Sequence, residues 1–377
     1  MAKEVLILGA GFGGLELAAS LSERFGDEVS VTLIDKSDTF VFGFSKLDIM
    51  FGHATPESVR IPYRRILKPG LRFLQQTVTA IDPVARRVTT DAGTFEPDIL
   101  VVALGADYDF AATPGLAEAG HEFYTVAGAT ALRDVIAGFS SGRAVVGVCG
   151  APYKCPPAPS EAALLLHDNL VTKGVRDRCE ITLVIPFAVP IPPSPETSRA
   201  LLDAFAERGI HCVADRRVAS LDGARKVAVL NDGSELPFDL FLGVPVHRAP
   251  AVVEASGMTE NGWIKVDRET LATKWPGVYA IGDVSFTGAP KAGVFAEGAG
   301  RAVATSIIAN LAGSGTHSPY LGAGHCYIEF GAGRVGTVEI DFFSGPKPAG
   351  KFIEPSKERR ADKKKFGSSR EARWFGE

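Results

Sequence analysis

The sequence predicts an α/β protein with two Rossmann-like domains, the second inserted into the first, and a small C-terminal module. Three observations support this fold class. An apolar run at residues 4–8 leads directly into the motif G-x-G-x-x-G at residues 9–14, as a buried parallel strand leads into a helix. A second alternation of apolar runs and helical segments follows between residues 144 and 241. A third apolar run, at residues 277–283, is placed to rejoin the first sheet.

Length and composition set the domain organisation that we expect. The chain has 377 residues, of which 46% are hydrophobic, and this is enough for two or three globular domains with cores of their own. We predict a first domain in two segments, residues 1–108 and 249–315, around an inserted domain at residues 109–248. Residues 316–377 form the predicted C-terminal module, with two strands before a charged end.

The N-terminal unit carries the strongest motif. Gly9 suits a tight turn, Gly11 lets the backbone approach a pyrophosphate, and Gly14 permits close packing of helix on strand. The N–H groups that begin the following helix are free to bind phosphate. Asp35 ends the second predicted strand, where a carboxylate accepts hydrogen bonds from ribose hydroxyls and disfavours a 2′-phosphate. The unit therefore predicts a dinucleotide site, with further contacts from Phe12, Gly13 and Lys36.

Two further segments indicate that the dinucleotide is FAD. The apolar run at residues 98–107 contains Ala103 and Gly105 and is typical of the strand that returns to the dinucleotide in glutathione-reductase-type flavoproteins. A later run ends in Gly282 and Asp283, and resembles a signature whose aspartate binds the flavin ribityl chain. An aspartate that closes an apolar strand is costly to bury without a donor partner. Each segment alone also fits a plain buried strand, but the three in this order predict FAD.

Bulk properties exclude several classes of protein. The net charge of −4 gives no reason to expect a nucleic-acid partner, and the apolar stretches are too short to span a bilayer. The first residues run into the first strand without the pattern of a signal peptide, so we expect a cytoplasmic, reducing location. There, five cysteines are not expected to form a structural disulfide framework. None of the seven histidines has the spacing of a metal site, so no metal is predicted.

The inserted domain departs from a nucleotide-binding pattern where its first strand ends. A second glycine-rich loop is expected there, but the chain continues Cys149-Gly-Ala-Pro-Tyr-Lys-Cys155-Pro-Pro-Ala-Pro. The prolines at positions 156, 157 and 159 remove N–H donors and fix the backbone, so a phosphate cradle does not form easily. The next strand runs into Ile-Pro-Phe at residues 185–187 without a ribose-binding acid. We therefore predict that the site for a pyridine nucleotide is lost or altered.

Three segments of this chain resemble a known group of flavoproteins. Cys155-Pro-Pro-Ala-Pro-Ser-Glu161 is similar to Cys-Pro-Pro-Gly-Pro-Tyr-Glu in the flavoprotein subunit of flavocytochrome c sulfide dehydrogenase. More broadly, the chain resembles the sulfide:quinone oxidoreductase superfamily. The segment at residues 289–293 is similar to its Pro-Lys-Ser/Thr-Gly, and His325-Cys326-Tyr327 to its Asn-Thr-Cys-Tyr. The resemblance covers most of residues 1–330, and its cysteine motifs are more specific than the FAD motifs.

The resemblance implies a reaction and the residues that carry it. It implies that Cys155 and Cys326 form a redox-active disulfide beside the flavin, with Cys326 nearer the reactive flavin carbon. Sulfide or a related sulfur compound attacks this disulfide, and the electrons pass through FAD to a quinone or an electron-accepting protein. Lys291 is expected to stabilise the reduced flavin, and Glu161 to carry protons near Cys155. Glu161 also fits a plain first-turn carboxylate after a Ser160 cap.

The other cysteines and a neighbouring histidine have simpler interpretations. Adjacent residues of a strand point to opposite faces, so we do not expect His325 to lower the pKa of Cys326. Cys179 and Cys212 are expected to pack as small apolar groups. Cys149 fits either packing, which we favour, or a third redox thiol near Cys155.

The chain also departs from the group that it resembles. Flavocytochrome-type subunits attach FAD through a cysteine in the loop after the second strand, but residues 37–45 contain none, so we expect non-covalent FAD. The tail at residues 357–375 is charged, where quinone-linked members often carry a hydrophobic or amphipathic anchor. We favour a solvated helix or a strap packed on the domain. The alternative is peripheral contact with the inner face of an anionic membrane, with Trp374 and Phe375 dipping in.

Two other functions stay open at this point. One is an NAD(P)H-dependent flavin oxidoreductase that holds nicotinamide without a glycine loop, similar to NADH:quinone or ferredoxin reductases. The other is a non-enzymatic redox sensor that only binds FAD. The sequence fixes neither the sulfur donor nor the acceptor, and a homodimer is one of the oligomeric states that it allows.

Overall fold

A five-stranded parallel sheet forms the centre of the first domain, in the strand order β22-β9-β1-β2-β5. The computed structural model describes residues 3–313 and 317–376, so the predicted boundary between residues 315 and 316 lies outside the described residues. The strands are β1 (Lys3–Leu8), β2 (Val29–Asp35), β5 (Leu71–Gln75), β9 (Ile99–Val102) and β22 (Val278–Ala280).

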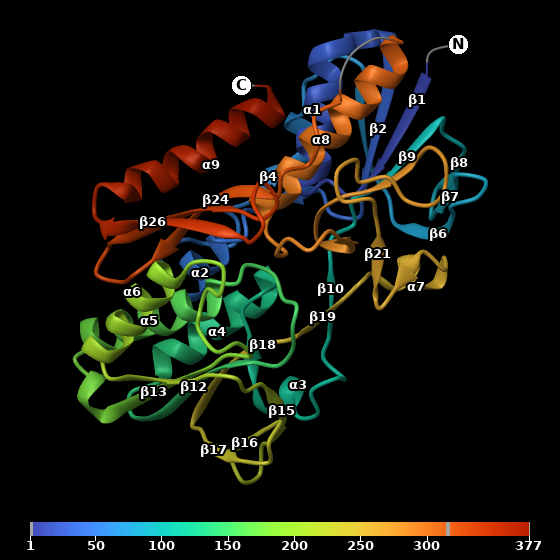
Figure 1. Ribbon diagram of the computed structural model, residues 1–377. Helices are drawn as coiled ribbons and strands as arrows, with labels where there is room; N and C mark the ends of the chain where they lie inside the picture. Colours follow the sequence, from blue (N-terminus) through green and yellow to red (C-terminus); the bar gives the residue numbers. More distant parts are fainter. Residues whose placement is uncertain (1–2, 314–316, 377) are drawn as a thin grey trace.

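Helices α1 (Phe12–Phe25) and α8 (Gly293–Ala312) lie side by side against one face of this sheet (Figure 1). Val5 and Ile7 belong to the core under these helices, whereas Leu6 and Leu8 belong to the core on the opposite face. This alternation follows from the two-residue period of a strand, and both sets are buried because the sheet is covered on both sides. The opposite face carries a three-stranded antiparallel sheet of β6 (Val78–Asp82), β7 (Arg87–Thr90) and β8 (Gly93–Phe95).

The inserted domain repeats this plan. Its parallel sheet has the order β11-β18-β12-β13-β14. One face packs against three helices, and the other against the antiparallel sheet β15-β16-β17. The elements are β11 (His121–Glu122), α4 (Val126–Gly138), β12 (Gly142–Val148), α5 (Ala158–Thr172), β13 (Cys179–Val184), α6 (Pro195–Glu207), β14 (Ile210–Val213), β15 (Val218–Asp222), β16 (Val227–Leu230), β17 (Glu235–Pro237) and β18 (Leu240–Val244).

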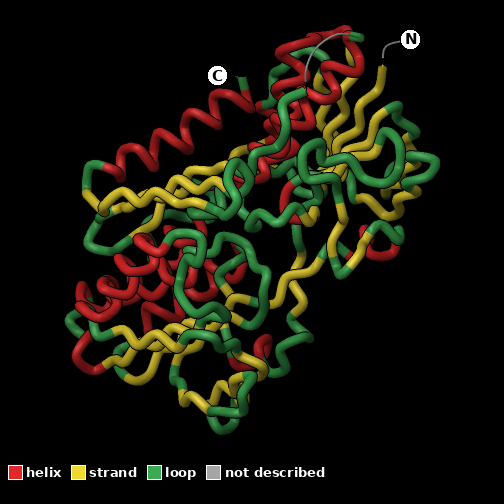
Figure 2. The backbone as a smooth tube through the Cα atoms, in the orientation of Figure 1, coloured by secondary structure: helices red, strands yellow, loops and turns green. Residues whose placement is uncertain are grey.

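A two-stranded antiparallel ribbon joins the two domains. The chain leaves the first domain along β10 (Asp107–Asp109) and returns along β19 (Val246–Arg248), and the two strands pair directly. Figure 2 shows this ribbon crossing between two bodies of mixed helix and strand. The predicted fold class, with one Rossmann-like domain inserted into the other, is therefore confirmed.

Short elements complete both domains. The turn after β2 holds the pair β3 (Thr39–Phe40) and β4 (Ile61–Pro62) and helix α2 (Ser45–Met50). Helix α3 (Leu116–Ala119) precedes the inserted sheet. The returning segment contributes α7 (Ala251–Ala255), β20 (Thr259–Glu260), β21 (Trp263–Lys265) and β23 (Ser285–Phe286).

The C-terminal module is an antiparallel sheet of three strands with one helix across it (Figure 1). Its elements are β24 (Ala323–Glu329), β25 (Val335–Asp341), β26 (Ala349–Ser356) and α9 (Arg359–Phe375). The sequence predicted two strands and a charged end, so the prediction missed β26. This strand lies at the edge of the sheet and has no buried residue, which explains its weak apolar pattern.

Helix α9 is a strap packed on the first domain. Trp374 and Phe375 are 1% and 0% exposed. The Trp374 ring meets Phe12 and Phe40 edge to face at centroid distances of 5.3 and 5.5 Å. The idea that Trp374 and Phe375 dip into a membrane is therefore wrong, because both side chains belong to the core of the protein. Among the described residues, no helix combines the length and apolarity needed to cross a membrane.

Buried ion pairs fix this strap. Arg373 Nε lies 3.0 Å from a carboxylate oxygen of Glu16, a fully buried residue of α1, and Trp374 Nε1 donates a 2.8 Å hydrogen bond to the same carboxylate. Arg370 Nε pairs with Glu297 of α8 at 2.7 Å. Buried carboxylates need such partners, so the basic residues of the tail serve the fold here.

Candidate functional site

A cavity of about 370 Å³ opens where the strands of the first parallel sheet end. In doubly wound folds, the carboxyl ends of the strands are the edge that binds dinucleotides. The residues that these strand ends contribute are Gly9, Asp35, Ala103, Gly105, Gly282 and Asp283, all of them predicted contacts. Gly11, Phe12 and Gly13 line the same cavity from the start of α1.

The glycine loop is shaped for close approach. Gly9 has φ +104°, and a Cβ there would lie 2.3 Å from the carbonyl oxygen of Ala103. A Cβ on Gly14 would lie 2.0 Å from the Gly9 oxygen, which explains why this glycine packs behind the loop. A Cβ on Gly11 would meet no protein atom within 4 Å, and this residue lines the cavity. No side chain caps the first turn of α1, so its N–H groups fit a pyrophosphate.

Asp35 holds the loop in place as well as lining the cavity. One carboxylate oxygen accepts a 2.8 Å hydrogen bond from the Ala10 N–H, and the other accepts one of 2.8 Å from the Ser37 N–H. Tyr63 donates from its hydroxyl to the Ala10 oxygen at 2.8 Å. The turn between β1 and α1 is therefore fixed from both sides. The adjacent Lys36, also a predicted contact, is exposed and does not line the cavity.

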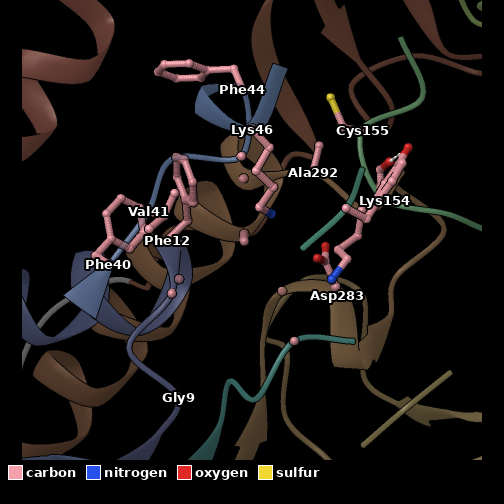
Figure 3. A pocket seen from close by; sticks show the side chains of 18 of the residues that line it. Gly9, Phe12, Phe40, Val41, Phe44, Lys46, Lys154, Cys155, Asp283 and Ala292 are labelled. Carbon is pink, nitrogen blue, oxygen red and sulfur yellow. Dashed lines mark hydrogen bonds between the residues drawn. The ribbon is translucent and has the colours of Figure 1, made fainter. Parts of the chain in front are cut away.

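The charges of three lysines, Lys46, Lys154 and Lys291, act on the Asp283 carboxylate, and Figure 3 shows the first two of them beside the same cavity as Asp283. Lys154 Nζ donates to the Ala106 oxygen at 2.9 Å, and Lys291 Nζ donates to the backbone oxygen of Asp283 at 2.5 Å. Burial lowers the pKa of both Lys46 and Lys291 to about 8, although the Asp283 carboxylate opposes this shift. The sequence pointed to Lys291 and Asp283 but not to Lys46 or Lys154. A lysine within a short helix or beside a cysteine forms no recognisable pattern.

Cys155 stands at the rim of this cavity, directly before α5. Its backbone has φ 54°, its N–H donates to the Lys291 oxygen at 2.7 Å, and its carbonyl oxygen accepts from the Ala158 N–H at 2.8 Å. Solvent reaches the side chain through the open cavity that it lines. Many protein atoms nevertheless lie around the sulfur. Burial therefore raises the pKa of the thiol, and the Glu161 carboxylate raises it further.

Cys326 lies on β24 and lines a second cavity of about 350 Å³. Most of the lining is apolar and comes from proline and aromatic side chains, including Pro156, Pro157, Phe187 and Phe342. Burial raises the pKa of Cys326 to about 12, and Glu161 contributes to the shift. The Cys326 sulfur also contributes to the raised pKa of Cys155. All five cysteines, which lie among the described residues, are free thiols in this structure.

The neighbours of the two thiols behave largely as expected. His325 approaches Glu339 at 3.6 Å and lines a separate groove between α8 and α9, so it does not act on Cys326. Cys149 is 2% exposed and packs with Val145 and Phe241 on the β15–β17 side of the sheet. The packing interpretation of Cys149 is therefore confirmed.

Glu161 is a buried carboxyl group whose charge acts on both thiols and on Lys363 of the tail. It accepts a 2.9 Å hydrogen bond from the Glu329 N–H, and Lys363 of α9 pairs with the Glu329 carboxylate at 2.6 Å. Burial raises the pKa of Glu161 to about 7, although the charge of Lys363 opposes this. Helix α5 begins at Ala158 after Pro157, so Ser160 is not the predicted cap. Glu161 lies in the first turn of α5, as expected.

The predicted site residues thus fall into two groups. Cys155 and Glu161 share the first cavity with the predicted FAD contacts, whereas Lys291 and Cys326 line the second. Ala292 lines both cavities, so the two adjoin at this residue. In the inserted domain, the turn from β12 to α5 holds Cys155 and the prolines where a glycine loop was expected.

Comparison with known proteins shows the family to which a chain with this arrangement belongs. The family of pyridine nucleotide-disulphide oxidoreductases matches residues 3–300. The chain belongs to this family. Among the relatives of this oxidoreductase, a sulfide-quinone reductase of Aquifex aeolicus is 27% identical over 362 residues, which cover 88% of this chain and 82% of the relative. A type II NADH:quinone oxidoreductase of Staphylococcus saprophyticus is 33% identical over 147 residues, or 37% of each chain.

A solved structure has the same fold. The X-ray structure of the sulfide:quinone oxidoreductase from Aquifex aeolicus matches this oxidoreductase with a TM-score of 0.86 at 24% identity, and covers 98% of this chain and 90% of that one. The resemblance to the sulfide:quinone oxidoreductase superfamily is confirmed. The family implies a flavin cofactor, and the glycine loop, the free helix N-terminus and the cavity at the strand ends fit one.

Proposed function

We propose that this protein is an FAD-dependent oxidoreductase that oxidises sulfide through a Cys155–Cys326 disulfide and passes the electrons to a quinone. The observation that carries the proposal is the position of the two cysteines. They are remote in sequence, yet Cys155 lines the cavity of the predicted flavin site and Cys326 lines the cavity that adjoins it. The names of the relatives support sulfide as donor and quinone as acceptor.

The residues of the first cavity bind and orient the cofactor. The N–H groups at the start of α1 would bind its pyrophosphate, and Gly11, which has no Cβ, would leave room for it. The segment after β2, residues 37–45, contains no cysteine, so FAD is bound without a covalent link there. When bound, the flavin accepts two electrons and passes them on to the acceptor.

The apolar lining of the second cavity supports the entry of hydrogen sulfide in its neutral form, because desolvation disfavours charge. Glu161, which lines the adjoining first cavity, accepts the proton, since a carboxyl group with a pKa of about 7 is present in both forms near neutral pH. Hydrosulfide then attacks the Cys326 sulfur and forms a persulfide there. The S–S bond breaks, and Cys155 leaves as a thiolate that carries the electron pair of that bond.

The open form then loses the persulfide proton and two electrons, which the flavin held in the first cavity would take up. The Cys155 sulfur then bonds to the outer persulfide sulfur, so that the two cysteines are joined through the added atom. The resemblance implied the opposite order, with Cys326 next to the flavin. The lining of the two cavities supports Cys155 in that position instead.

Anaerobic mixing of the flavin-loaded protein tests the proposal. We expect sulfide to bleach the flavin absorbance and NADH to leave it unchanged. Cys155→Ser and Cys326→Ser should keep the flavin and lose bleaching by sulfide. Cys212→Ser is the matched control, because this half-buried thiol lies at the edge of the core of the inserted domain. Bleaching of Cys155→Ser at the wild-type rate, or bleaching of the wild type by NADH, would contradict the proposal.

A further inference from the structure

Cys155 has a backbone conformation that glycine adopts far more readily than any other residue. Its φ of 54° lies in the left-handed region, where a Cβ is crowded. A residue that precedes a proline, as Cys155 does, is normally extended with a negative φ. Among the described residues, Cys155 is the one residue other than glycine with such a φ that lines either cavity. Backbone strain of this kind persists only where neighbouring groups hold it, and it is concentrated at functional sites.

The strained turn lies where the loop before α5 passes from one cavity to the other. Lys154 and Cys155 line the first cavity, whereas Pro156 and Pro157 line the second together with Cys326. Figure 3 shows the side chains of Lys154 and Cys155 leaving this loop in different directions, with that of Lys154 running toward Asp283. The conformation of the turn therefore decides on which side of the loop the Cys155 sulfur stands.

Lys154 is tied down at both its side chain and its backbone. Its Nζ donates to the Ala106 oxygen at 2.9 Å and lies 4.4 Å from the centroid of the Tyr108 ring. Its carbonyl oxygen accepts a 2.9 Å hydrogen bond from the hydroxyl of Tyr124. This carbonyl belongs to the peptide group that joins Lys154 to Cys155, so the Tyr124 hydroxyl fixes one edge of that group.

The opposite edge of the same peptide group is also fixed. It is the N–H of Cys155, which donates to the Lys291 oxygen at 2.7 Å. On the other side of the residue, the Cys155 carbonyl accepts from the Ala158 N–H at 2.8 Å. A change of φ at Cys155 must rotate a peptide group, and each rotation breaks at least one of these contacts.

Tyr124 is placed to act on this turn through its hydroxyl. The residue is 6% exposed, its ring meets the His247 ring edge to face at 5.3 Å, and its backbone oxygen accepts from the Tyr108 hydroxyl at 3.1 Å. Burial raises the pKa of Tyr124 well above its usual value, so the hydroxyl stays protonated and donates. Loss of this one oxygen would leave the ring packed and release the Lys154 carbonyl.

We propose that Tyr124 is a positioning residue that holds Cys155 in the left-handed conformation from which its sulfur bonds to Cys326. The inference rests on the proposed function, which pairs these two cysteines. When their bond is reduced, the contact with the Tyr124 hydroxyl prevents the turn from relaxing to a negative φ. The open form therefore gains little by conformational change, and the protein favours closure of the disulfide.

Equilibration with mixtures of reduced and oxidised dithiothreitol measures this preference in the flavin-loaded protein without oxygen. In the exchange, the protein disulfide becomes two thiols and the reagent dithiol becomes its disulfide. Acid trapping, alkylation and peptide mass spectrometry then give the fraction of protein in which Cys155 and Cys326 are linked. We expect Tyr124→Phe to lower the equilibrium constant for disulfide formation about tenfold, which corresponds to about 30 mV. Tyr279→Phe is the matched control, because this buried tyrosine lines neither cavity.

Glycine and alanine at position 155 test the strain without a disulfide. Glycine adopts a left-handed φ at no steric cost, so Cys155→Gly should unfold at a higher urea concentration than Cys155→Ala. At a position with a negative φ the order is reversed, because glycine gains more conformational freedom on unfolding. In the Tyr124→Phe background the advantage of glycine should shrink, since the turn can then relax.

Two results would overturn the role given to Tyr124. One is an equilibrium constant in Tyr124→Phe equal to that of the wild type and of Tyr279→Phe. The other is a Cys155→Ala variant at least as stable as Cys155→Gly, which would show that the turn is not strained. Failure of the proposed function is a separate result, since it appears as wild-type protein in which Cys155 and Cys326 form no bond at any ratio of the reagent, and it would remove the basis of this inference as well.

Discussion

Removal of the Trp374 side chain should loosen both the fold and the cofactor site. Trp374 is 1% exposed and packs on Phe12 and Phe40, which line the cavity at the strand ends. Its indole N–H donates to the buried carboxylate of Glu16. Trp374→Ala therefore removes a wall behind the cavity together with one partner of a buried charge.

The size of the effect follows from these contacts. Truncation of a fully buried aromatic side chain to alanine lowers the free energy of unfolding by about 3–5 kcal/mol. Trp374→Phe keeps an apolar ring and loses the hydrogen bond, which contributes about 1–2 kcal/mol. Glu16 keeps Arg373 and Arg301 as partners in both variants, at 3.0 and 3.5 Å, so its charge is not left alone. Trp374→Ala should therefore lower the free energy of unfolding more than Trp374→Phe does.

Urea unfolding and FAD titration measure the two consequences. We expect Trp374→Ala to shift the unfolding midpoint most and to weaken FAD binding, because Phe12 and Phe40 lose their support. Val84→Ala, at a side chain that is 78% exposed, should change stability by less than about 0.5 kcal/mol. A loss of unfolding free energy below about 1 kcal/mol in Trp374→Ala, with unchanged FAD affinity, would show that Trp374 supports neither the fold nor the cofactor site.

Two further predictions concern Gly11 and Glu161. Gly11→Ala should leave the unfolding midpoint of the apoprotein unchanged and weaken FAD binding about tenfold or more, since the added Cβ meets no protein atom and points into the space for the cofactor; normal affinity in a titration would contradict this. Burial raises the pKa of Glu161 from 4.5 to about 7, so its stabilising contribution is complete below pH 4.5 and is lost as pH rises through 7. As pH rises from 5 to 8, the free energy of unfolding of Glu161→Gln, measured in urea, should increase by up to about 3 kcal/mol relative to that of the wild type. Parallel stability curves would show that Glu161 is not held neutral by its surroundings.

Local sequence patterns were enough to predict most of the first domain. The strand, glycine loop and helix at residues 4–25 and the strand end at Asp35 are adjacent in sequence, so their geometry follows from short-range sterics and periodicity. The same holds for the returning run that ends at Asp283. Each of these segments ends at the edge of one sheet, and the topology then brings them to a single cavity.

Contacts between distant segments could not be predicted in this way. Lys46 and Lys363 are single charges in short or strongly charged helices, and tertiary packing alone decides that Lys46 faces the cavity and that Lys363 is buried. Trp374 and Phe375 follow a basic stretch that is typical of an exposed helix. Glu16 and Glu297, which hold that stretch, lie in helices far earlier in the chain.

Peptide mapping of the air-oxidised, flavin-loaded protein under non-reducing conditions tests directly whether Cys155 and Cys326 form a disulfide. We expect a peptide pair joined by a bond between Cys155 and Cys326, which disappears on reduction, while Cys149, Cys179 and Cys212 stay free. Unlinked Cys155 and Cys326, or a bond from either of them to another cysteine, would contradict it.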